Sequence, residues 1–480
     1  METIDQWIAG RPQASSDAAV LSVFDPVTGH AYARCPQGTA ADISAAVAAA
    51  RSAFPAWSAL KASERAHWLN RLADAIEARS EAFWSCESHD TGKPIALVRE
   101  IEIPRAIANF RFFAAACSQS LDQAFHQESG LNYTLHQPLG VVGVISPWNL
   151  PLYLLSWKLA PALAAGNCVI AKPSEITPMS ADLLARTAQE IGFPAGVLNI
   201  VQGAGETVGA ALVAHPEVKA ISFTGSTAVG HRIAAVCADQ FKKVTLEMGG
   251  KNPALVFPDA PAHTLKTLVR AAFQNSGQIC LCGSRILIHR DIYGEFKKAF
   301  VAESSALKIG APSDPATQLG PVMSEAHFRK VLAYIAQAKD EGGSILCGGK
   351  AVKPEACNGW FIAPTVIEGL PMESGFCQDE IFGPVVSLHA FDDDDHALAL
   401  ANASRYGLAA SVWTDDLMRA HRIADELECG IVWINTWMQR DLRTPFGGMK
   451  QSGFGREGGM EAMTFFTEPK TVCIGALPNG

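Results

Sequence analysis

The chain reads Val141-Val142-Gly143-Val144-Ile145-Ser146-Pro147-Trp148-Asn149 at the point where its pattern changes from alanine-rich helix to short β-branched runs. Further apolar runs, separated by helix-like segments, follow at residues 168–171, 197–201, 220–223, 243–246, 254–257, 284–288 and 430–434. Strands that alternate with helices are typical of βαβ units and a parallel sheet. The pattern therefore predicts two α/β domains that join near residue 250.

The segments before residue 141 have a different character. The spacing of apolar residues predicts helices at 41–53, 62–78 and 97–115. The last should be kinked at Pro104, because proline cannot donate a backbone hydrogen bond inside a helix. Residues 131–140 alternate and then turn, which is typical of an exposed strand pair. A small β element is therefore expected beside the two domains.

Length and composition restrict the class of protein. The 480 residues exceed what one hydrophobic core usually serves, and 48% hydrophobic with 18% charged residues is ordinary for a folded protein. A net charge of −9 without a run of lysines or arginines argues against nucleic-acid binding. Residues 150–171 are apolar but broken by Lys158, Pro161 and Asn167, so we expect no membrane span. The start lacks a secretory signal, which favours a cytoplasmic location.

The twelve cysteines are scattered without paired spacing. In a chain of this length that distribution predicts reduced thiols and no disulfide framework. Cys280-Leu281-Cys282 has a spacing that some metal sites use, but no matching Cys/His pair lies nearby in the sequence. We therefore expect no bound metal.

Lys172 and Glu175 stand directly after the apolar run at 168–171. Ligands of open α/β sheets bind at the carboxyl ends of strands. A carboxylate at this place accepts hydrogen bonds from ribose hydroxyls and repels the additional phosphate of NADP, which favours NAD as cofactor. A solvated Lys/Glu pair with no ligand is an equally open interpretation of these two residues taken alone.

A glycine-containing turn follows a later strand, and it reads Phe223-Thr224-Gly225-Ser226-Thr227-Ala228-Val229-Gly230. Its two glycines are five residues apart and open a predicted helix. Backbone N–H groups at such a helix start can face a pyrophosphate. The spacing is not GxGxxG, so the turn by itself is a weak signal for a dinucleotide.

Two further stretches carry reactive groups. One reads Phe273-Gln274-Asn275-Ser276-Gly277-Gln278-Ile279-Cys280 and offers a thiol after a glycine turn, and the other reads Leu246-Glu247-Met248-Gly249-Gly250 and offers a carboxylate. A thiol nucleophile and a carboxylate base are the groups that covalent oxidation of an aldehyde requires. Asn149 can donate its amide to a developing oxyanion together with the Cys280 N–H. An Asx turn explains Asn149 equally well.

These motifs, together with Glu380-Ile381-Phe382-Gly383-Pro384-Val385 and in this chain order, resemble the aldehyde dehydrogenase superfamily over nearly the whole chain. The resemblance implies the α/β fold class, with two doubly wound parallel-sheet domains plus a small β oligomerisation element. It implies an NAD-binding domain at 1–117 and 138–249 and a catalytic domain at 250–447. The oligomerisation element of a homodimer or homotetramer would occupy 118–137 and 463–480.

The resemblance also implies a role for individual residues. Cys280 would form a thiohemiacetal and then a thioester, Glu247 would activate the water that hydrolyses the thioester, and Asn149 would stabilise the oxyanion. Lys172 and Glu175 would hold the adenosine ribose of NAD, and Glu380 and Phe382 the nicotinamide ribose and ring. The other residues expected at the NAD site are Ile145, Ser146, Pro147, Trp148, Ser174, Gly205, Phe223, Thr224, Gly225, Ser226, Val229 and Gly249.

Arginines near the expected substrate tunnel indicate the class of aldehyde. Arg105 follows Glu102-Ile103-Pro104, and Arg440 and Arg443 frame Asp441-Leu442. Arginine binds carboxylates through a planar fork. Both segments resemble those of dehydrogenases for 2-aminomuconic and 2-hydroxymuconic semialdehyde. We expect Arg105 and Arg443 to bind a substrate carboxylate, with Arg440 ranked behind them.

Two alternatives stay open at the level of sequence. The chain can be a broad aliphatic or betaine-type aldehyde dehydrogenase in which the arginines are structural, although a quaternary ammonium substrate would favour an aromatic cage without cations. It can also be a catalytically silent protein that retained the fold, because fold does not imply function. Comparing the oxidation of a cationic and an anionic aldehyde distinguishes the first alternative from a semialdehyde dehydrogenase. Detection of an aldehyde adduct at Cys280 excludes the second alternative.

Overall fold

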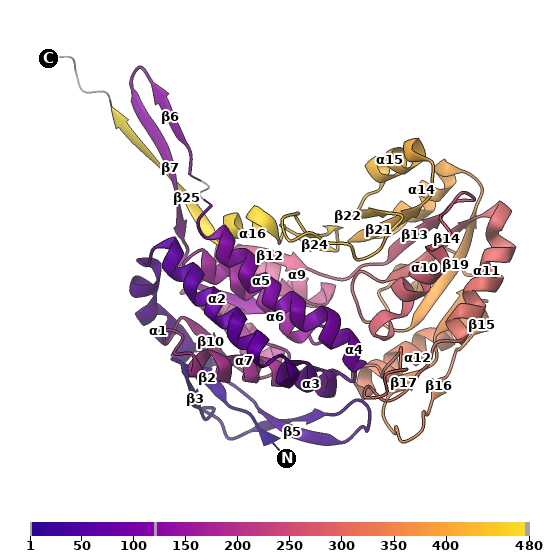
Figure 1. Cartoon of the computed structure of the whole chain (residues 1–480), viewed down its shortest axis with the longest axis horizontal. Helices are drawn as coiled ribbons and strands as arrows, with labels where there is room; N and C mark the ends of the chain where they lie inside the picture. The colour runs from indigo at the N-terminus through magenta and orange to yellow at the C-terminus, as the bar shows by residue number, and fades with distance from the viewer. Residues whose placement is uncertain (1, 120–121, 476–480) are drawn as a thin grey trace.

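The computed structural model describes residues 2–119 and 122–475, which form two α/β bodies and a projecting β-arm (Figure 1). The first body carries most of the N-terminal half of the chain, and the second is built on strands between residues 252 and 434. Residues 120–121 and 476–480 of the expected oligomerisation element lie outside the described part. Among the residues described, no helix is both long and apolar enough to cross a membrane.

The first body is built on an eight-stranded sheet in the order β24-β12-β11-β8-β9-β10-β2-β3. Its parallel centre consists of β8 (Val141–Ile145), β9 (Cys168–Lys172), β10 (Leu198–Ile200), β11 (Val218–Thr224) and β12 (Lys243–Glu247). The antiparallel edge strands are β2 (Gln6–Ile8), β3 (Arg11–Gln13) and β24 (Gly453–Phe454). The winding reverses between β8 and β11, so their carboxyl ends open a crevice of the kind that binds nucleotides.

Helix α6 (Pro151–Ala164) lies at the centre of this body, and all of its residues are buried. A helix that is hydrophobic on every side must be covered on every side. It lies side by side with α2 (Ala62–Ala78) and α5 (Ile103–Ala116) (Figure 1). The other helices of this body are α1 (Ala40–Ser58), α3 (Ser80–Thr91), α7 (Met179–Glu190), the π-helical turn η2 (Gly205–Gly209), α8 (Ala210–Ala214) and α9 (Thr227–Asp239).

Where a kink was expected at Pro104, the structure has a change from π-helix to α-helix. The chain runs through α4 (Ile95–Leu97) and the π-helical turn η1 (Val98–Glu102) before α5 begins, with Pro104 in the first turn of α5. Proline is tolerated in the first turn of a helix, where its missing N–H has no partner to lose. The helical path therefore continues past the proline and carries Arg105 towards α6.

The second body is built on a seven-stranded sheet in the order β15-β18-β19-β14-β13-β21-β22, and only β15 (Ser344–Cys347) is antiparallel. The parallel strands are β13 (Asn252–Val256), β14 (Gly283–His289), β18 (Thr365–Glu368), β19 (Val385–Phe391), β21 (Ala409–Trp413) and β22 (Ile431–Ile434). Its helices are α10 (Thr264–Phe273), the short turn η3 (Gln274–Gly277), α11 (Arg290–Ser305), α12 (Glu325–Asp340), α13 (Gly375–Gln378), α14 (Asp394–Asn402) and α15 (Leu417–Glu426). The fold class predicted from the sequence is confirmed.

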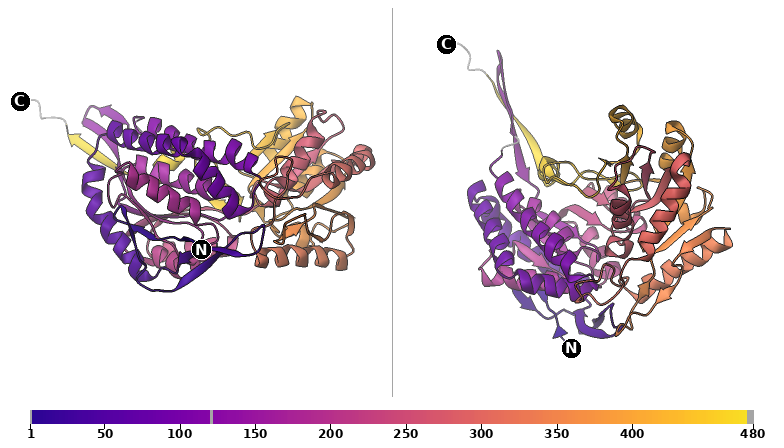
Figure 2. Two further views of the ribbon diagram at one scale, coloured as in Figure 1. Left: turned by 60° about the horizontal axis from the view of Figure 1, so that its bottom comes forward. Right: turned by 45° about the vertical axis from the view of Figure 1, so that its right-hand side comes forward.

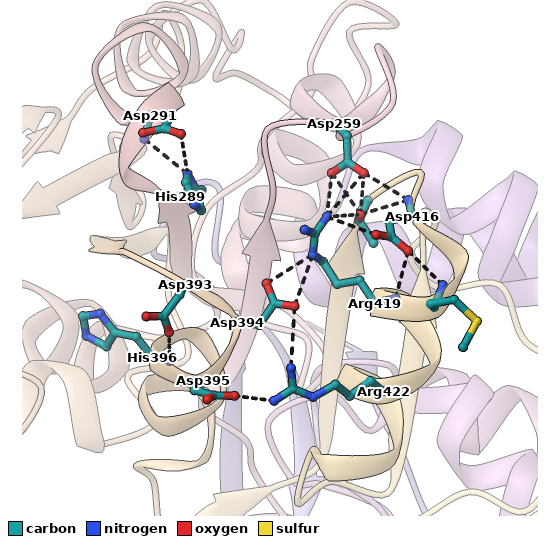
Figure 3. Close-up of polar contacts among 12 residues, drawn as sticks. Asp259, His289, Asp291, Asp393, Asp394, Asp395, His396, Asp416, Arg419 and Arg422 are labelled. Atoms are coloured by element: carbon teal, nitrogen blue, oxygen red, sulfur yellow. Dashed lines mark hydrogen bonds and ion pairs between the residues drawn. The ribbon is translucent and has the colours of Figure 1, made fainter.

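An ion-pair network ties α14 and α15 to this sheet (Figure 3). Arg419 of α15 lies 3.4 Å from an Asp259 oxygen and 3.2 Å from an Asp394 oxygen. Its guanidinium also lies 4.8 Å over the Phe257 ring. Partly exposed pairs contribute little free energy singly, so we assign this network the role of orienting α15 on the sheet.

The arm is a three-stranded antiparallel sheet of β6 (Ala124–Gln127), β7 (Gly130–Pro138) and β25 (Thr467–Gly475), and it projects from the first body (Figure 2). β7 and β25 pair along their whole length, from Thr467 opposite Pro138 to Gly475 opposite Gly130. Phe125 and Ile474 on its outer strands are 54% and 53% exposed. Free sheet edges with exposed apolar side chains call for cover.

The remaining elements are short. A three-stranded sheet of β1 (Glu2–Thr3), β5 (Ala31–Pro36) and β4 (Val20–Phe24) lies near the N-terminus (Figure 1). Two two-stranded sheets and one helix complete the fold, namely β16 (Ala351–Val352) with β17 (Phe361–Ile362), β20 (Tyr406–Gly407) with β23 (Met449–Lys450), and α16 (Gly459–Phe465).

Candidate active site

The turn before Cys280 has an uncommon backbone. Asn275, Ser276 and Gly277 all have positive φ, at 53°, 53° and 72°. A Cβ on Gly277 would stand 2.0 Å from the Gly383 carbonyl oxygen, so only glycine fits there. Such strained turns persist where surrounding contacts hold them, and they cluster at functional sites.

Side chains of this turn anchor it to a neighbouring segment. Ser276 Oγ donates to the Gly320 carbonyl at 2.7 Å, and Gln278 Oε1 accepts from the Met323 N–H at 2.9 Å. Both polar side chains are buried. The turn is therefore fixed on both sides of Gly277, and it presents Cys280 at the edge of a cavity.

Cys280 is partly buried, and its surroundings disfavour the thiolate. Burial raises the pKa of the Cys280 thiol far above its usual range, and the Glu380 and Glu247 carboxyl groups raise it further, against an opposing effect of Arg440. The resting residue is therefore a thiol. A base must take its proton before it can attack a carbonyl carbon.

Glu247 stands at the carboxyl end of β12 and is 3% exposed. Neither of its carboxyl oxygens has a hydrogen-bond partner. Burial raises the pKa of Glu247 well above its usual range, with a further contribution from Glu457. A buried acid that shares a cavity with a thiol has the properties of a general base, and this one ionises at a higher pH than an ordinary glutamate.

A buried polar cluster lies behind Glu247. Lys158 of α6 contacts Glu457 at 2.5 Å and donates to Ser222 Oγ at 3.0 Å, and Ser222 donates to Glu457 Oε1 at 2.9 Å. Lys158 opposes the rise in the Glu247 pKa. Sequence reasoning missed this cluster, because its three members come from segments separated by 64 to 299 positions and no short motif joins them.

Asn149 is 4% exposed and lines the same cavity as Cys280. Its Nδ2 donates to the Gln278 carbonyl at 2.9 Å, and its own carbonyl accepts from Asn275 Nδ2 at 3.3 Å. An amide nitrogen carries two hydrogens. One of them holds Asn149 to the cysteine turn, and the second is available to an oxygen bound beside Cys280.

A cavity of about 260 Å³ opens at the crevice between β8 and β11. It brings together eleven of the residues singled out in the sequence, namely Pro147, Trp148, Asn149, Thr224, Gly225, Ser226, Glu247, Gly249, Cys280, Glu380 and Phe382. The thiol and the expected nucleotide residues therefore share one space. His327 and Lys330 of α12 also line it, and no sequence motif had indicated them.

The Glu380 carboxyl group packs against the backbone of Gly249 and Gly250, and a side chain at Gly249 would collide with it. A Cβ on Gly249 would stand 1.9 Å from Glu380 Oε2, and the Gly250 N–H donates to Glu380 Oε1 at 3.2 Å. Burial raises the pKa of Glu380 to about 7. The carboxyl group is thus held in the cavity beside Cys280, where a hydroxyl-bearing ligand can donate to it.

An aromatic group shapes the wall next to Glu380. Phe382 has a positive φ of 64°, and its carbonyl contacts His327 Nε2 at 2.6 Å. The Trp148 ring lies 5.3 Å from the Phe382 ring and 5.4 Å from His327. Burial lowers the pKa of His327 to about 4, so the imidazole is neutral at pH 7.

The helix start after β11 fits a phosphate group. α9 begins at Thr227 with Ser226 as its N-cap, whose Oγ accepts from Val229 N at 3.4 Å. Thr224 Oγ1 and Ser146 Oγ are buried without hydrogen-bond partners. Unpartnered donors beside an open helix N-terminus fit the pyrophosphate of a dinucleotide.

The residues expected at the adenosine end lie beyond this cavity. Lys172 Nζ is ion-paired with Glu175 Oε2 at 2.6 Å, and the Glu175 side chain is 29% exposed. Ser174 Oγ accepts from Ile176 N at 3.3 Å. The others outside the cavity lining are Ile145, Ser146, Gly205, Phe223 and Val229.

A small inner pocket of about 20 Å³ connects Cys280 and Glu247 to Tyr153 and Arg440. Arg440 Nη1 donates to the Tyr153 hydroxyl at 3.0 Å, and its guanidinium lies 5.4 Å from the Trp157 ring centre. The Arg105 guanidinium lies 5.4 Å from the same ring and 5.5 Å from Tyr153. Both guanidinium groups therefore lie against the Trp157 ring, and of the two Arg440 lines the inner pocket.

Arg443 does not line this pocket. Its side chain is 79% exposed and is paired with Asp441 at 2.6 Å. Of the two, only Arg440 lines the inner pocket, so the geometry favours Arg440, and a substrate contact by Arg443 stays a prediction. The reason for the difference is local, because Asp441 also accepts from the Arg443 backbone N–H at 2.9 Å and so turns the side chain back onto its own loop.

Comparisons with known proteins show to which family the whole chain is similar. The family model "Aldehyde dehydrogenase family" matches residues 13–472. The 2-aminomuconic semialdehyde dehydrogenase of Danio rerio is 47% identical, with 98% of each chain covered. The 2-hydroxymuconic semialdehyde dehydrogenase of Pseudomonas sp. (strain CF600) is 43% identical over 99% of this chain and 100% of that protein. The crystal structure of PnpE from Pseudomonas sp. WBC-3 in complex with nicotinamide adenine dinucleotide has a TM-score of 0.96 and 42% identity, covering 99% of this chain and 98% of that one.

Proposed function

The chain belongs to the aldehyde dehydrogenase family, and on that premise we propose that it uses NAD to oxidise an aldehyde that carries a carboxylate. The substrate class is that of 2-aminomuconic and 2-hydroxymuconic semialdehyde, on which its relatives are named as acting. The product is the corresponding dicarboxylic acid.

One observation supports a carboxylate group on the substrate. Within the part of the chain that the structure describes, Arg105 Nη2 is buried without a hydrogen-bond partner, and its guanidinium lies against the same Trp157 ring as that of Arg440. Among the described residues, neither arginine forms an ion pair within 4.0 Å. A buried guanidinium without an anion is costly unless a ligand supplies one. A substrate carboxylate at this place supplies it.

The chemistry begins at Cys280. Glu247 takes the thiol proton, and the sulfur adds to the aldehyde carbon to give a thiohemiacetal. Asn149 Nδ2 and the Cys280 N–H stabilise the oxyanion. When bound, NAD supplies the acceptor for the hydride that leaves this carbon. After Glu247 has released the thiol proton to solvent, it deprotonates the water that hydrolyses the thioester, and Cys280 leaves as the acid is released.

The described residues fit NAD at each of its parts. The start of α9 with Thr224 would hold the pyrophosphate, Glu380 the nicotinamide ribose, and Lys172 with Glu175 the adenosine ribose. The carboxylate of Glu175 disfavours the additional phosphate of NADP. Phe382 and Trp148 would bound the nicotinamide side of the cavity.

The test compares an anionic semialdehyde with its neutral methyl ester in an assay of NADH formation. Arg105→Ala and Arg440→Ala should each raise KM for the anion by roughly 10- to 100-fold, since a charge-assisted hydrogen bond contributes about 1.5–3 kcal/mol. Turnover of the ester should change little in Arg105→Ala, whereas Arg440→Ala should also slow the ester, because Arg440 lowers the pKa of Cys280. Arg443→Ala is the matched control, because its guanidinium is held by Asp441.

Equal losses for the two substrates would contradict carboxylate recognition and favour a broad aliphatic enzyme. A preference for a quaternary ammonium aldehyde would favour a betaine-type enzyme. The two guanidinium groups on the Tyr153 and Trp157 rings argue against a cationic substrate, because they would repel it from the faces that it needs.

A further inference from the structure

The crossing of α5 and α6 beneath the two arginines contains a fully buried asparagine, Asn109, which is 0% exposed. It lies one helical turn after Arg105, so their side chains are neighbours on the face of α5 that contacts α6. Its position in the sequence, inside an apolar helical run, had given no reason to assign it a role.

The side-chain amide of Asn109 is used at both ends. Oδ1 accepts from Arg105 Nε at 3.2 Å, while Nδ2 donates to the Tyr153 carbonyl at 3.2 Å and to Ser156 Oγ at 3.0 Å. The opposite orientation would place the amide hydrogens against the Arg105 N–H and the amide oxygen against a carbonyl. The hydrogen bonds therefore determine one orientation, which links Arg105 to the backbone of Tyr153.

The linkage leaves one edge of the Arg105 guanidinium unused. Nε is occupied by Asn109, the guanidinium lies over the Tyr153 and Trp157 rings, and Nη2 is buried without a partner. The Arg105 guanidinium is planar, and contacts at Nε and at its ring-facing side leave it few orientations. The free Nη2 edge is thus oriented before any ligand arrives, which reduces the entropy lost on binding.

The partner of Arg105 is also uncharged. Arg111, on the same helix, is ion-paired with Asp74 at 2.9 Å and with Glu77 at 2.6 Å. Arg105 has an amide in place of such carboxylates. The charged groups that act on it are Arg440 and Asp441, and the Asp441 carboxylate is itself paired with Arg443. The charge of Arg105 is therefore not compensated by a carboxylate in contact with it.

We propose that Asn109 is a positioning residue for substrate specificity. It holds the Arg105 guanidinium with its Nη2 edge free, and because it is neutral it leaves the charge of Arg105 to a substrate carboxylate. This inference rests on the proposed function, since it requires that Arg105 binds an anionic aldehyde.

Asn109→Asp tests the part played by neutrality, because it keeps the shape and adds a carboxylate within reach of Arg105 Nε. KM for the anionic semialdehyde should rise about 10- to 100-fold, because the introduced carboxylate pairs with Arg105 and competes with the substrate carboxylate. We expect kcat for the anion, and both constants for its methyl ester, to stay within about twofold. Asn358→Asp, which adds the same charge on an exposed turn between β16 and β17, is the matched control.

Asn109→Leu tests the part played by orientation and remains informative if the Asp variant does not fold. Leucine is neutral and has the same branched heavy-atom skeleton, so we expect KM for the anion to rise by a smaller factor, about 3- to 10-fold, with the ester again little affected. Turnover of the ester serves as the check that each variant is folded.

The outcomes separate this inference from the proposed function. If the wild-type enzyme and Arg105→Ala show no preference between anion and ester, the proposed function itself fails. If Arg105→Ala loses the preference for the anion while folded Asn109→Asp and Asn109→Leu keep it, only the role of Asn109 is rejected. Equal losses on anion and ester in both Asn109 variants would reduce Asn109 to a structural residue and also reject the inference.

Discussion

Burial disfavours the ionised forms of the two reacting side chains, Cys280 and Glu247. Among the residues described, Glu247 has no hydrogen-bond partner for either oxygen, and the Glu247 and Glu380 carboxyl groups both raise the pKa of the Cys280 thiol. Ionising either group places an anion where water is scarce. The raised pKa of Glu247 means that the fraction of ionised base, and with it kcat, should increase with pH well above the range of an ordinary glutamate.

Replacing Glu247 by glutamine removes the base but keeps the shape. Deacylation should slow by about 10²- to 10⁴-fold, the usual contribution of a general base. NADH should still form in a burst, slowed because no base takes the Cys280 proton, and rapid-mixing absorbance measures the burst against the steady state. Full steady-state turnover by Glu247→Gln would contradict the assignment of Glu247 as the base.

The same substitution should change the dependence of stability on pH. The folded-state pKa of Glu247 is raised, so the folded protein retains a proton that the unfolded chain has already released. The free energy of unfolding of the wild type therefore falls as pH rises above the unfolded-state pKa. The Tm of Glu247→Gln should exceed that of the wild type by more at pH 8 than at pH 5, and a constant difference would argue against a raised pKa.

At the scale of elements, the site depends on two turns packed backbone to backbone. The turn that precedes Cys280 contacts the loop of Glu380 through Gly277 and Gly383. On the other side, the turn after β12 leaves room for Glu380 at Gly249. The nucleophile, the base and the expected ribose ligand are therefore spaced by contacts between turns, and no single element carries all three.

Gly277→Ala should disrupt this contact. The new methyl group would stand 2.0 Å from the Gly383 carbonyl oxygen, at a φ of 72° that costs an L-residue about 1 kcal/mol or more. We expect a loss of kcat of at least tenfold and a lower Tm. Gly294→Ala in α11 is the control, since its Cβ meets nothing within 4 Å and alanine favours a helix. Equal behaviour of the two variants would show that the close approach is not needed.

At the scale of the whole molecule, the arm is the part that the fold leaves uncovered. Its sheet of β6, β7 and β25 has two free edges, and Phe125 and Ile474 are exposed on it. Free edges are templates for pairing with another chain. A homodimer or homotetramer built through the arm is the assembly that we propose, as the sequence had also indicated.

Phe125→Lys combined with Ile474→Lys should lower the molar mass in solution. Like charges on facing copies of the arm oppose their association, while the bodies with the active site are untouched. Size-exclusion chromatography with light scattering gives the mass, and far-UV circular dichroism checks the fold. An unchanged oligomeric mass in the double variant would place the interface elsewhere.

Several features followed from sequence because their causes are local. The strands at β8, β9, β11 and β12 were expected within two residues of their observed ends, since a run of buried β-branched residues bounded by turns has few other conformations. The strands β18, β19 and β21 were not anticipated, although they belong to the same kind of sheet. Their sequences lie among segments whose apolar spacing does not distinguish strand from helix.

The sequence by itself determined the family, the alternation of strands and helices that builds the two parallel sheets, and the order of the reactive motifs. Each of these depends on residues that are neighbours in the chain. Only the tertiary structure decided which arginine lines the pocket that also holds Cys280 and Glu247. Arg440 and Arg443 are three positions apart and chemically identical. Arg443 is ion-paired with Asp441, whereas Arg440 contacts Tyr153 and Trp157 of a helix nearly 290 positions away. That choice depends on packing between distant segments, which no local pattern encodes.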